Sequence, residues 1–410
     1  MTVLGEHRSV DAGTPSDTGT PLRDGAPLTP SAATASASES GEPGAWRPER
    51  GVGDRRFAEI GPLRLENGQV LDDVTIAYET WGELDRDHGN AVLVLHALTG
   101  DSHVRGPAGG GHPSPGWWEE MVGPGRPIDT DRFHVIAPNV LGGCQGTTGP
   151  SSPAADGHPY GSRFPVITTR DQVAAERRLR DQLGIERWAL VIGGSMGGMR
   201  AIEWGVSHPD EVERLCIIAS SARATADQIA WNNAQIASIQ LDPEYRGGDY
   251  YGADSGQGPK SGLGIARRIA HTTYRTAEEL ESRFGNQAQG REDPYDGQGR
   301  HQVTSYLDHH AVKLARRFDA NSYVTLAQTM STHDVGRGRG GVVQALGRVR
   351  ARTLVVAIDS DRLFPPALVE EIAQHVPHAQ WQVAASPVGH DAFLLTHPGL
   401  QEWISTLIGD

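Results

Sequence analysis

The sequence VIGGSMGGMRAIEW, at residues 191–204, carries the clearest structural signal in this chain of 410 residues. Branched apolar residues run into Gly-Gly-Ser-Met-Gly at 193–197, and a pattern with helical period follows. A Gly-x-Ser-x-Gly motif in this context is typical of a sharp turn between a strand and a helix, where larger flanking residues would collide. The glycines therefore present the hydroxyl of Ser195 above a sheet, close to a helix N-terminus.

Short apolar runs recur before and after this motif, as in strands that are covered on both faces. Several alternate with segments of helical period, such as residues 170–185 and 199–209, which predicts an α/β fold with a mostly parallel sheet and helices on both faces. Asn67-Gly68 lies between alternating apolar residues and predicts an opening antiparallel hairpin with a tight type I′ turn. The later predicted strands cover residues 91–96, 133–138, 188–193, 214–220, 353–358 and 381–385.

The composition changes along the chain and suggests three parts. Residues 1–45 are rich in Ser, Thr, Pro, Gly and Ala, so we expect a disordered tail, without the charge and apolar pattern of a secretory signal. Between residues 222 and 345 the strand pattern gives way to helical periods. We therefore expect a helical lid at 222–345, inserted into an α/β core formed by residues 46–221 and 346–410.

Charge and cysteine content exclude several classes of function. The formal net charge of -14, from 37 basic and 51 acidic residues, argues against a nucleic-acid partner held by phosphate contacts. No apolar stretch approaches the roughly 20 residues that a membrane span needs. Cys144 and Cys216 are too few for a disulfide framework and lack the spacing of a zinc site. We expect a cytoplasmic protein with interior thiols and no metal.

A serine hydroxyl becomes a useful nucleophile when a histidine accepts its proton and a carboxylate orients that histidine. With an elbow of this kind, the partners follow in the order Asp or Glu, then His, each after a later strand. Asp359 and Asp361 follow the predicted strand 353–358, and His390 follows the last strand. Because Asp359 lies so close to the strand end, we predict a catalytic triad of Ser195, Asp361 and His390.

Acyl transfer also needs hydrogen-bond donors for the developing oxyanion. One should be the backbone N–H of Met196, the residue after the serine. The other should come from the loop after strand 91–96, which contains Leu98 and Thr99, and we assign it to the N–H of Leu98.

Beyond the serine elbow, the chain resembles the homoserine O-acetyltransferases, which are acyltransferases of methionine biosynthesis with the α/β-hydrolase fold. The resemblance extends over most of residues 60–405 and is far more specific than the elbow alone. It is carried by HALTGDSHV (96–104), NVLGGCQGTTGPSS (139–152), GGSMGGMRAIEW (193–204), GDYY (248–251), GLGIARRIAHTTY (262–274), RFDANSYVTLAQTM (317–330), SDRLFPP (360–366) and GHDAFL (389–394).

The resemblance implies that Ser195 carries the acyl group and that Arg267, Asp391 and Thr99 contact the acceptor. A zwitterionic amino acid needs a cation for its carboxylate and an anion for its ammonium, and these charges fit Arg267 and Asp391. The chain departs from the family pattern at Arg200 and Glu176, where many relatives carry Gln. Both departures lie outside the predicted chemistry.

The resemblance also implies the reaction and its partners. Acetyl-CoA would serve as co-substrate, L-homoserine as acceptor, and no cofactor would stay bound. The protein would be a homodimer paired through the inserted helices. Other readings stay open: a succinyl-CoA donor, serine or another alcohol as acceptor, an esterase with the same triad, or a non-catalytic binding protein. The opposed charges of Arg267 and Asp391 count against a simple esterase, which has no need of them.

Overall fold

The fold is built around an eight-stranded sheet. The computed structural model describes residues 44–251, 258–297 and 299–409. The strand order is β1-β2-β6-β3-β7-β8-β9-β10. The pairs β1/β2 and β2/β6 are antiparallel, and every later pair is parallel, as the sequence predicts. The strands are β1 (Arg56–Arg64), β2 (Val70–Trp81), β3 (Ala91–Leu95), β6 (His134–Pro138), β7 (Leu190–Gly194), β8 (Arg214–Ile218), β9 (Arg352–Ile358) and β10 (Gln380–Ala384), with a separate pair β4 (Val122–Gly123) and β5 (Ile128–Asp129). The predicted tail lies outside the described residues up to position 43.

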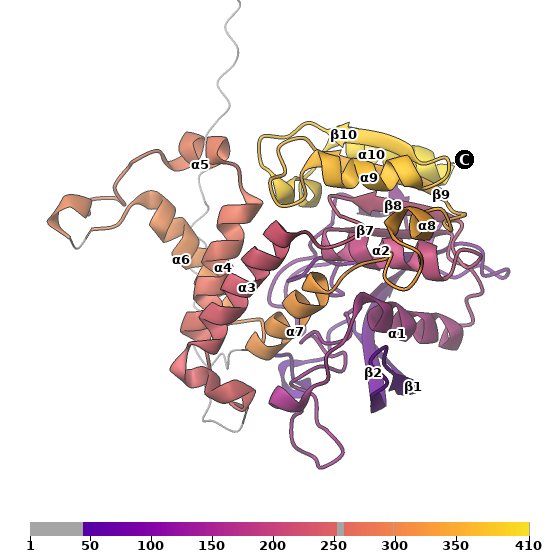
Figure 1. Cartoon of the computed structure of the whole chain (residues 1–410), viewed down its shortest axis with the longest axis horizontal. Helices are drawn as coiled ribbons and strands as arrows, with labels where there is room; N and C mark the ends of the chain where they lie inside the picture. Colours follow the sequence, from indigo (N-terminus) through magenta and orange to yellow (C-terminus); the bar gives the residue numbers. More distant parts are fainter. Residues whose placement is uncertain (1–43, 252–257, 298, 410) are drawn as a thin grey trace, which may run out of the picture. The chain divides into compact units, whose positions relative to one another are not determined.

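Helices cover both faces of the sheet, which confirms the predicted fold class (Figure 1). Neighbouring residues of β3 show the two faces: Leu93 and Leu95 belong to one buried core, Val92 and Val94 to the other. The first core includes residues of α1, α2 and α9, and the second includes residues of α10. The helices are α1 (Thr169–Gln182), α2 (Met196–Ser207), α3 (Ala226–Gln240), α4 (Lys260–Tyr274), α5 (Ala277–Phe284), α6 (Gln302–Ala315), α7 (Ala320–Ser331), α8 (Val342–Leu346), α9 (Pro366–His375) and α10 (Pro398–Gly409).

The opening hairpin forms, but the prediction of its turn was wrong. A type I′ turn needs positive φ at both central residues, whereas here only Gly68, with φ 88°, and not Asn67 has a positive φ. The backbone N–H of Gly68 donates to the Leu65 carbonyl at 2.9 Å, and Leu65 donates to Gln69 at 2.8 Å, which gives a longer loop. The Asn67 side chain stabilises it by accepting from the Gln69 amide and donating to the Val166 carbonyl.

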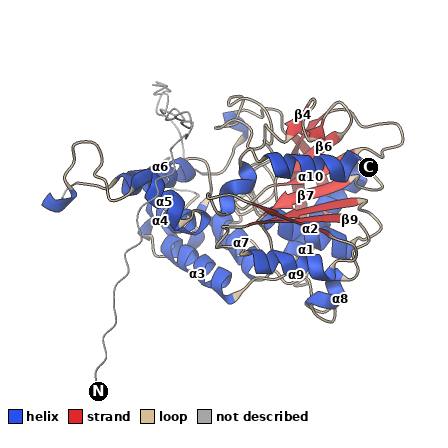
Figure 2. Cartoon of the chain, turned by 90° about the horizontal axis from the view of Figure 1, so that it is seen from above, coloured by secondary structure: helices blue, strands red, loops and turns tan. Residues whose placement is uncertain are grey.

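The segment between β8 and β9 contains the helices α3 to α8 and, in its described part, no strand (Figure 2). The segment that leaves β8 and the segment that returns toward β9 lie side by side. The amide of Ala224 donates to His333 at 2.9 Å, and that of Val335 donates to Ala222 at 3.0 Å. The helical character of this insertion was predicted, while its boundaries at 222–345 stay a prediction.

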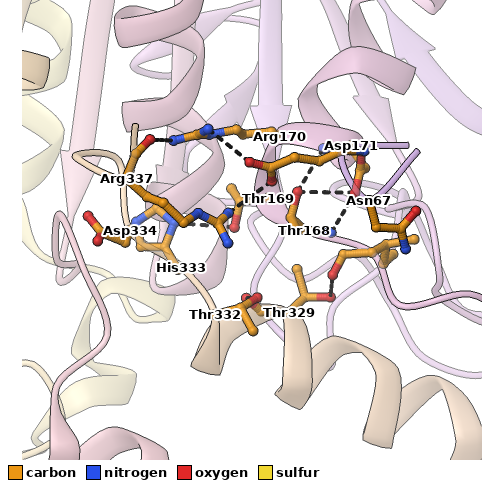
Figure 3. A network of polar contacts seen from close by, with 12 residues as sticks. Asn67, Thr168, Thr169, Arg170, Asp171, Thr329, Thr332, His333, Asp334 and Arg337 are labelled. Atoms are coloured by element: carbon orange, nitrogen blue, oxygen red, sulfur yellow. Dashed lines mark hydrogen bonds and ion pairs between the residues drawn. The ribbon is translucent and has the colours of Figure 1, made fainter. Parts of the chain in front are cut away.

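A network of polar contacts joins the returning segment, around His333, to the start of α1 (Figure 3). Thr168 and Asp171 form a reciprocal capping box at the start of α1. The ring of His333 lies 3.2 Å from the hydroxyl of Thr169 and 3.1 Å from the Ser221 carbonyl. The beginning of α1 therefore holds both ends of the helical insertion in place.

The described helices are too short or too polar to cross a membrane. Both cysteines are buried, as predicted, and burial raises the pKa of the Cys144 thiol to about 12. They are interior side chains rather than reactive thiolates.

Candidate active site

Ser195 lies on a strained turn between β7 and α2. Its φ of 57° and ψ of -124° are rare for a residue with a side chain, and its side chain makes no cap hydrogen bond to the helix. A Cβ at Gly193 would approach the Gly197 backbone to 2.4 Å, and one at Gly197 would approach the Leu95 carbonyl oxygen to 2.0 Å. The glycines are thus required by close backbone contacts, for the reason inferred from the sequence.

His390 begins the short 3-10 helix η5 (His390–Leu394) directly after the loop that follows β10. Its Nδ1 lies 2.6 Å from Oδ2 of Asp361 in the loop after β9. The other oxygen of Asp361 accepts the backbone N–H groups of Leu363, at 2.8 Å, and Phe364, at 2.9 Å. Asp361 is therefore fixed by the backbone and in turn orients the imidazole.

Two of the side chains that line a small space at Ser195 also pack against the imidazole of His390. A cavity of about 20 Å³ is lined by Ser195, Leu98, Tyr274 and Phe364, among others. The rings of Phe364 and Tyr274 lie 5.1 and 5.7 Å from the imidazole of His390. The Ser195 hydroxyl makes no hydrogen bond to any described residue, so its bond to the imidazole is not formed in this structure. Such bonds often tighten only when substrate is bound.

Burial and charge act in opposite directions on His390. Burial lowers its pKa, but the charge of Asp361 and the hydrogen bond to it, with a smaller contribution from Asp391, raise the pKa above the usual value for histidine. The imidazolium that forms when His390 takes a proton is thereby stabilised.

The two predicted oxyanion donors belong to two different segments near Ser195. Met196 is the first residue of α2, and Leu98 occupies a turn closed by a 2.9 Å hydrogen bond from the Gly100 amide to the Ala97 carbonyl. Among the described residues, neither the amide of Leu98 nor that of Met196 has an acceptor. Both N–H groups can thus donate to a substrate oxygen.

The residues predicted to contact the acyl acceptor fall into two groups. Nη1 of Arg267 lies 3.3 Å from the hydroxyl of Thr99, which places both beside the Leu98 turn. Asp391 instead pairs with Arg275, at 3.2 Å. The ring of Tyr274 links the two groups, because the charges of both Arg267 and Asp391 act on its hydroxyl, whose pKa burial raises.

The sequence analysis missed Arg275, Arg317 and Tyr274 as neighbours of this site. Arg317, which follows α6, donates to the Thr99 carbonyl at 2.7 Å. Tyr274 and Arg317 fall within the stretches that carry the family resemblance, and this was the available signal. Arg275 follows Tyr274 directly at the end of α4, and nothing in its spacing indicates its contact with Asp391.

A second buried cluster contains Glu79, His103 and His112, whose ligand atoms lie within 4.8 Å of one another. Nδ1 of His103 lies 2.9 Å from Glu79, and its Nε2 lies 3.2 Å from the Pro107 carbonyl, so both nitrogens face acceptors. The rings of His103 and His112 are stacked at 3.8 Å and 11°. Parallel rings direct their lone pairs side by side rather than at one point, so the cluster fits a buried ion pair better than a metal centre.

The chain is similar to known proteins in sequence over most of its length. A sequence model of the α/β hydrolase fold family matches residues 90–396. Homoserine O-acetyltransferase of Thermobifida fusca (strain YX) is 61% identical over 353 residues, which cover 86% of this chain and 93% of that protein. The enzyme of the same name from Clavibacter michiganensis subsp. michiganensis (strain NCPPB 382) is 55% identical over 369 residues, covering 89% of this chain and 95% of that protein.

Solved structures agree with the sequence relatives. The crystal structure of homoserine O-acetyltransferase from Bacillus anthracis superposes with a TM-score of 0.79 at 26% identity, over 87% of this chain and 97% of that one. Esterase E22 also superposes with a TM-score of 0.79, at 27% identity, over 86% of this chain and 99% of that one. From its fold and from these long alignments at high identity, the chain belongs to the homoserine O-acetyltransferases of the α/β hydrolase fold family.

Proposed function

We propose that this protein transfers an acetyl group from acetyl-CoA to the γ-hydroxyl of L-homoserine, giving O-acetyl-L-homoserine and CoA in methionine biosynthesis. The observation that carries the proposal is the strained Ser195 elbow, which shares the neighbours Phe364 and Tyr274 with the His390–Asp361 pair, in a chain 61% identical to an enzyme of that name. A covalent acyl-serine intermediate divides the reaction into two half-reactions, so the kinetics are ping-pong.

In the first half-reaction, Oγ of Ser195 attacks the thioester carbonyl carbon while Nε2 of His390 takes the hydroxyl proton. The carbonyl oxygen becomes an oxyanion, and the amides of Leu98 and Met196 donate hydrogen bonds to it. The C–S bond then breaks, and the proton on His390 passes to the sulfur. CoA leaves as a thiol, and an acetyl ester stays on Ser195.

In the second half-reaction, His390 takes the proton of the homoserine γ-hydroxyl, whose oxygen attacks the acetyl carbon. The bond to Ser195 breaks, and the proton returns to the Ser195 oxygen. Arg267, with Thr99 beside it, binds the acceptor carboxylate, and Asp391 binds the ammonium. These contacts favour the amino acid over water, which would otherwise hydrolyse the ester.

Positive charge near the site supports an anionic co-substrate. Burial lowers the pKa of Lys313 on α6, and the nearby charges of Arg317 and Arg267 lower it further. Three cations therefore lie close together in a chain whose net charge is -14. The phosphate groups of acetyl-CoA would relieve their mutual repulsion.

The alternatives differ in what the site has to accommodate. Support for an acetyl over a succinyl donor comes from the relatives named homoserine O-acetyltransferase, which are 61% and 55% identical to this chain. An esterase could use the same triad, and the structure of esterase E22 is similar to this chain. The charged pair of Arg267 and Asp391 favours transfer to an amino acid instead.

The central test is mass spectrometry of the intact protein after mixing with acetyl-CoA, without acceptor. We expect one acetyl group, located on Ser195 by peptide mapping, absent from the Ser195→Ala variant and discharged by L-homoserine faster than by water. Succinyl-CoA in a parallel reaction should give much slower labelling. No adduct at Ser195 would refute the mechanism, and discharge at equal rates with and without homoserine would favour the esterase.

The remaining expectations are a cytoplasmic location and a homodimer paired through the inserted helices. Ile265 on α4 and Val312 on α6 are apolar but exposed, which supports a partner surface on these packed helices. Light scattering should give twice the monomer mass, and Ile265→Asp with Val312→Asp should shift it toward the monomer. A monomer for the unmodified protein would refute this assignment.

A further inference from the structure

Arg200 and Glu176 form a fully buried ion pair in the core behind the active site. Arg200 lies on α2, five residues after Ser195, and its side chain is 0% exposed. Its Nη1 donates to Oε1 of Glu176 on α1 at 2.6 Å. The other carboxylate oxygen of Glu176 accepts the indole N–H of Trp204 at 2.8 Å. Helices α1 and α2 pack directly against each other (Figure 1).

The same guanidinium reaches the loop that carries the predicted oxyanion donor. Nη2 of Arg200 donates to the backbone carbonyl of His96 at 2.6 Å. His96 begins the segment 96–100, which we call the oxyanion loop and which contains Leu98. Arg200 thus connects α2, the helix that follows Ser195, to the oxyanion loop.

Further contacts leave His96 little freedom at this end of the loop. Its Nε2 accepts the backbone N–H of Val140 at 3.1 Å, and burial lowers the pKa of the ring to about 3, which keeps it neutral. A Cβ at Gly197, in the first turn of α2, would lie 3.1 Å from the same His96 carbonyl oxygen. The carbonyl of His96 is therefore held between α2 and Arg200, while the Val140 amide fixes its ring.

The use of an ion pair here needs a reason, because burying two charges is costly and apolar side chains of similar size often serve stability as well. A planar guanidinium can do what an apolar side chain cannot, since it donates to a carboxylate and to a carbonyl in fixed directions at the same time. The carboxylate of Glu176 fixes Nη1 of the guanidinium, and Nη2 in turn fixes the carbonyl of His96.

We infer that Arg200, oriented by Glu176, is a positioning residue that sets the direction of the Leu98 amide through the His96 carbonyl. Leu98 follows two residues later, in the turn closed by Gly100 and Ala97. The inference rests on the proposed function in one respect, which is that the Leu98 N–H stabilises the oxyanion. Arg200 itself touches neither substrate nor reacting atoms.

The test replaces the pair without leaving a buried charge. In the double variant Arg200→Met with Glu176→Gln, the amide oxygen at 176 can still accept from Trp204, but the donor to His96 is lost. The matched control is Arg339→Met with Glu203→Gln, because Glu203 lies on the same helix and is 1% exposed. Its ion pair with Arg339, at 2.6 Å, makes no contact with the oxyanion loop.

We expect acylation of Ser195 by acetyl-CoA to slow about 10- to 100-fold in the Arg200 double variant, somewhat less than deletion of an oxyanion donor. Hydrogen exchange should become faster at the Gly100 amide, whose bond to the Ala97 carbonyl closes the turn that contains Leu98. The KM for homoserine and the pH profile should stay as in the unmodified protein. The control pair should lose stability but keep its acylation rate and its hydrogen exchange at the Gly100 amide.

Acylation at the unmodified rate in the Arg200 variant, or equal slowing in both variants, would overturn the inference, since a purely structural pair predicts one of these. If the double variant does not fold, Arg200→Lys keeps the charge but not the planar fork, and the same two readouts apply. If the unmodified protein is not acylated at all, the proposed function fails instead. Unchanged hydrogen exchange at the Gly100 amide would then still refute the positioning role.

Discussion

The carboxylate of Asp391 lies 3.2 Å from the guanidinium of Arg275, and both side chains are mostly buried. Arg275 follows α4, and it also contacts Glu279 on α5 at 3.3 Å. A carboxylate that should bind the acceptor ammonium is thus already balanced by a cation from the helical insertion. The ammonium of homoserine has to share or displace this partner.

Replacement of Arg275 by Gln should therefore lower the KM for L-homoserine, by about 3- to 10-fold, because a repelling cation is removed and Asp391 gains negative potential. Acylation by acetyl-CoA should change little. Steady-state kinetics at saturating acetyl-CoA measures the effect. Arg283→Gln is the matched control, since Arg283 pairs with the same Glu279, at 2.8 Å. A higher KM would mean that Arg275 orients Asp391 rather than competing for it.

Arg267 is expected to separate transfer from hydrolysis. Arg267→Ala removes the cation for the acceptor carboxylate, so kcat/KM for homoserine should fall at least about 100-fold, as for loss of a charged hydrogen-bonded contact. Cleavage of p-nitrophenyl acetate should stay largely intact. The neighbouring variant Arg268→Ala should affect neither activity, because Arg268 pairs with Asp308 at 2.7 Å. Equal loss of both activities in Arg267→Ala would contradict the assigned contact.

The parts of the site that local sequence rules fix could be predicted. The flanking glycines have to accompany Ser195, because any Cβ at Gly193 or Gly197 would collide with backbone. Asp361 and His390 could be chosen because each follows a strand of a parallel sheet, whose carboxyl ends meet at one edge. The exact turn at Asn67 could not, since Asn-Gly suits several loop lengths and the contact of Asn67 with Val166, 99 residues away, has no signal in the local sequence.

Contacts between distant helices could not be predicted. Arg200 and Glu176 stood out only as departures from a family pattern, outside the chemistry, yet they contact each other at 2.6 Å and reach His96. Likewise, the pairing of Arg275 with Asp391 depends on how the insertion docks on the core. No periodicity in the sequence encodes that placement.

The pH dependence of acylation should report the imidazole of His390. The rate requires the neutral base, so it should rise with pH through an apparent pKa above 6.5, the usual value, because Asp361 raises it. In Asp361→Asn the carboxylate is lost, so burial dominates, and the ascending limb should move to lower pH while the plateau falls by about 10⁴-fold. Pre-steady-state acylation between pH 5 and 9 measures both. An unshifted limb would show that another group controls the profile.

Folding stability should decrease in acid because several histidines are buried in the neutral form. Burial lowers the pKa of His333 to about 4 from 6.5, so between these values the unfolded chain binds a proton that the folded chain does not. The free energy of unfolding therefore falls as pH drops below 6.5, by about 1.4 kcal/mol per pH unit for this residue, until pH reaches about 4. His333→Gln should reduce that slope by the same amount.

Urea unfolding at pH 7, 6, 5 and 4.5 measures the slope, and His309→Gln, an exposed substitution on α6, controls for the change of residue. A glutamine at 333 can still donate to the Ser221 carbonyl, so the variant should fold at neutral pH with the insertion in place. The slope of the unfolding free energy against pH could instead be the same in His333→Gln and the unmodified protein. His333 would then take up its proton in the folded state, and the contact between α1 and the returning segment would not be the acid-sensitive point.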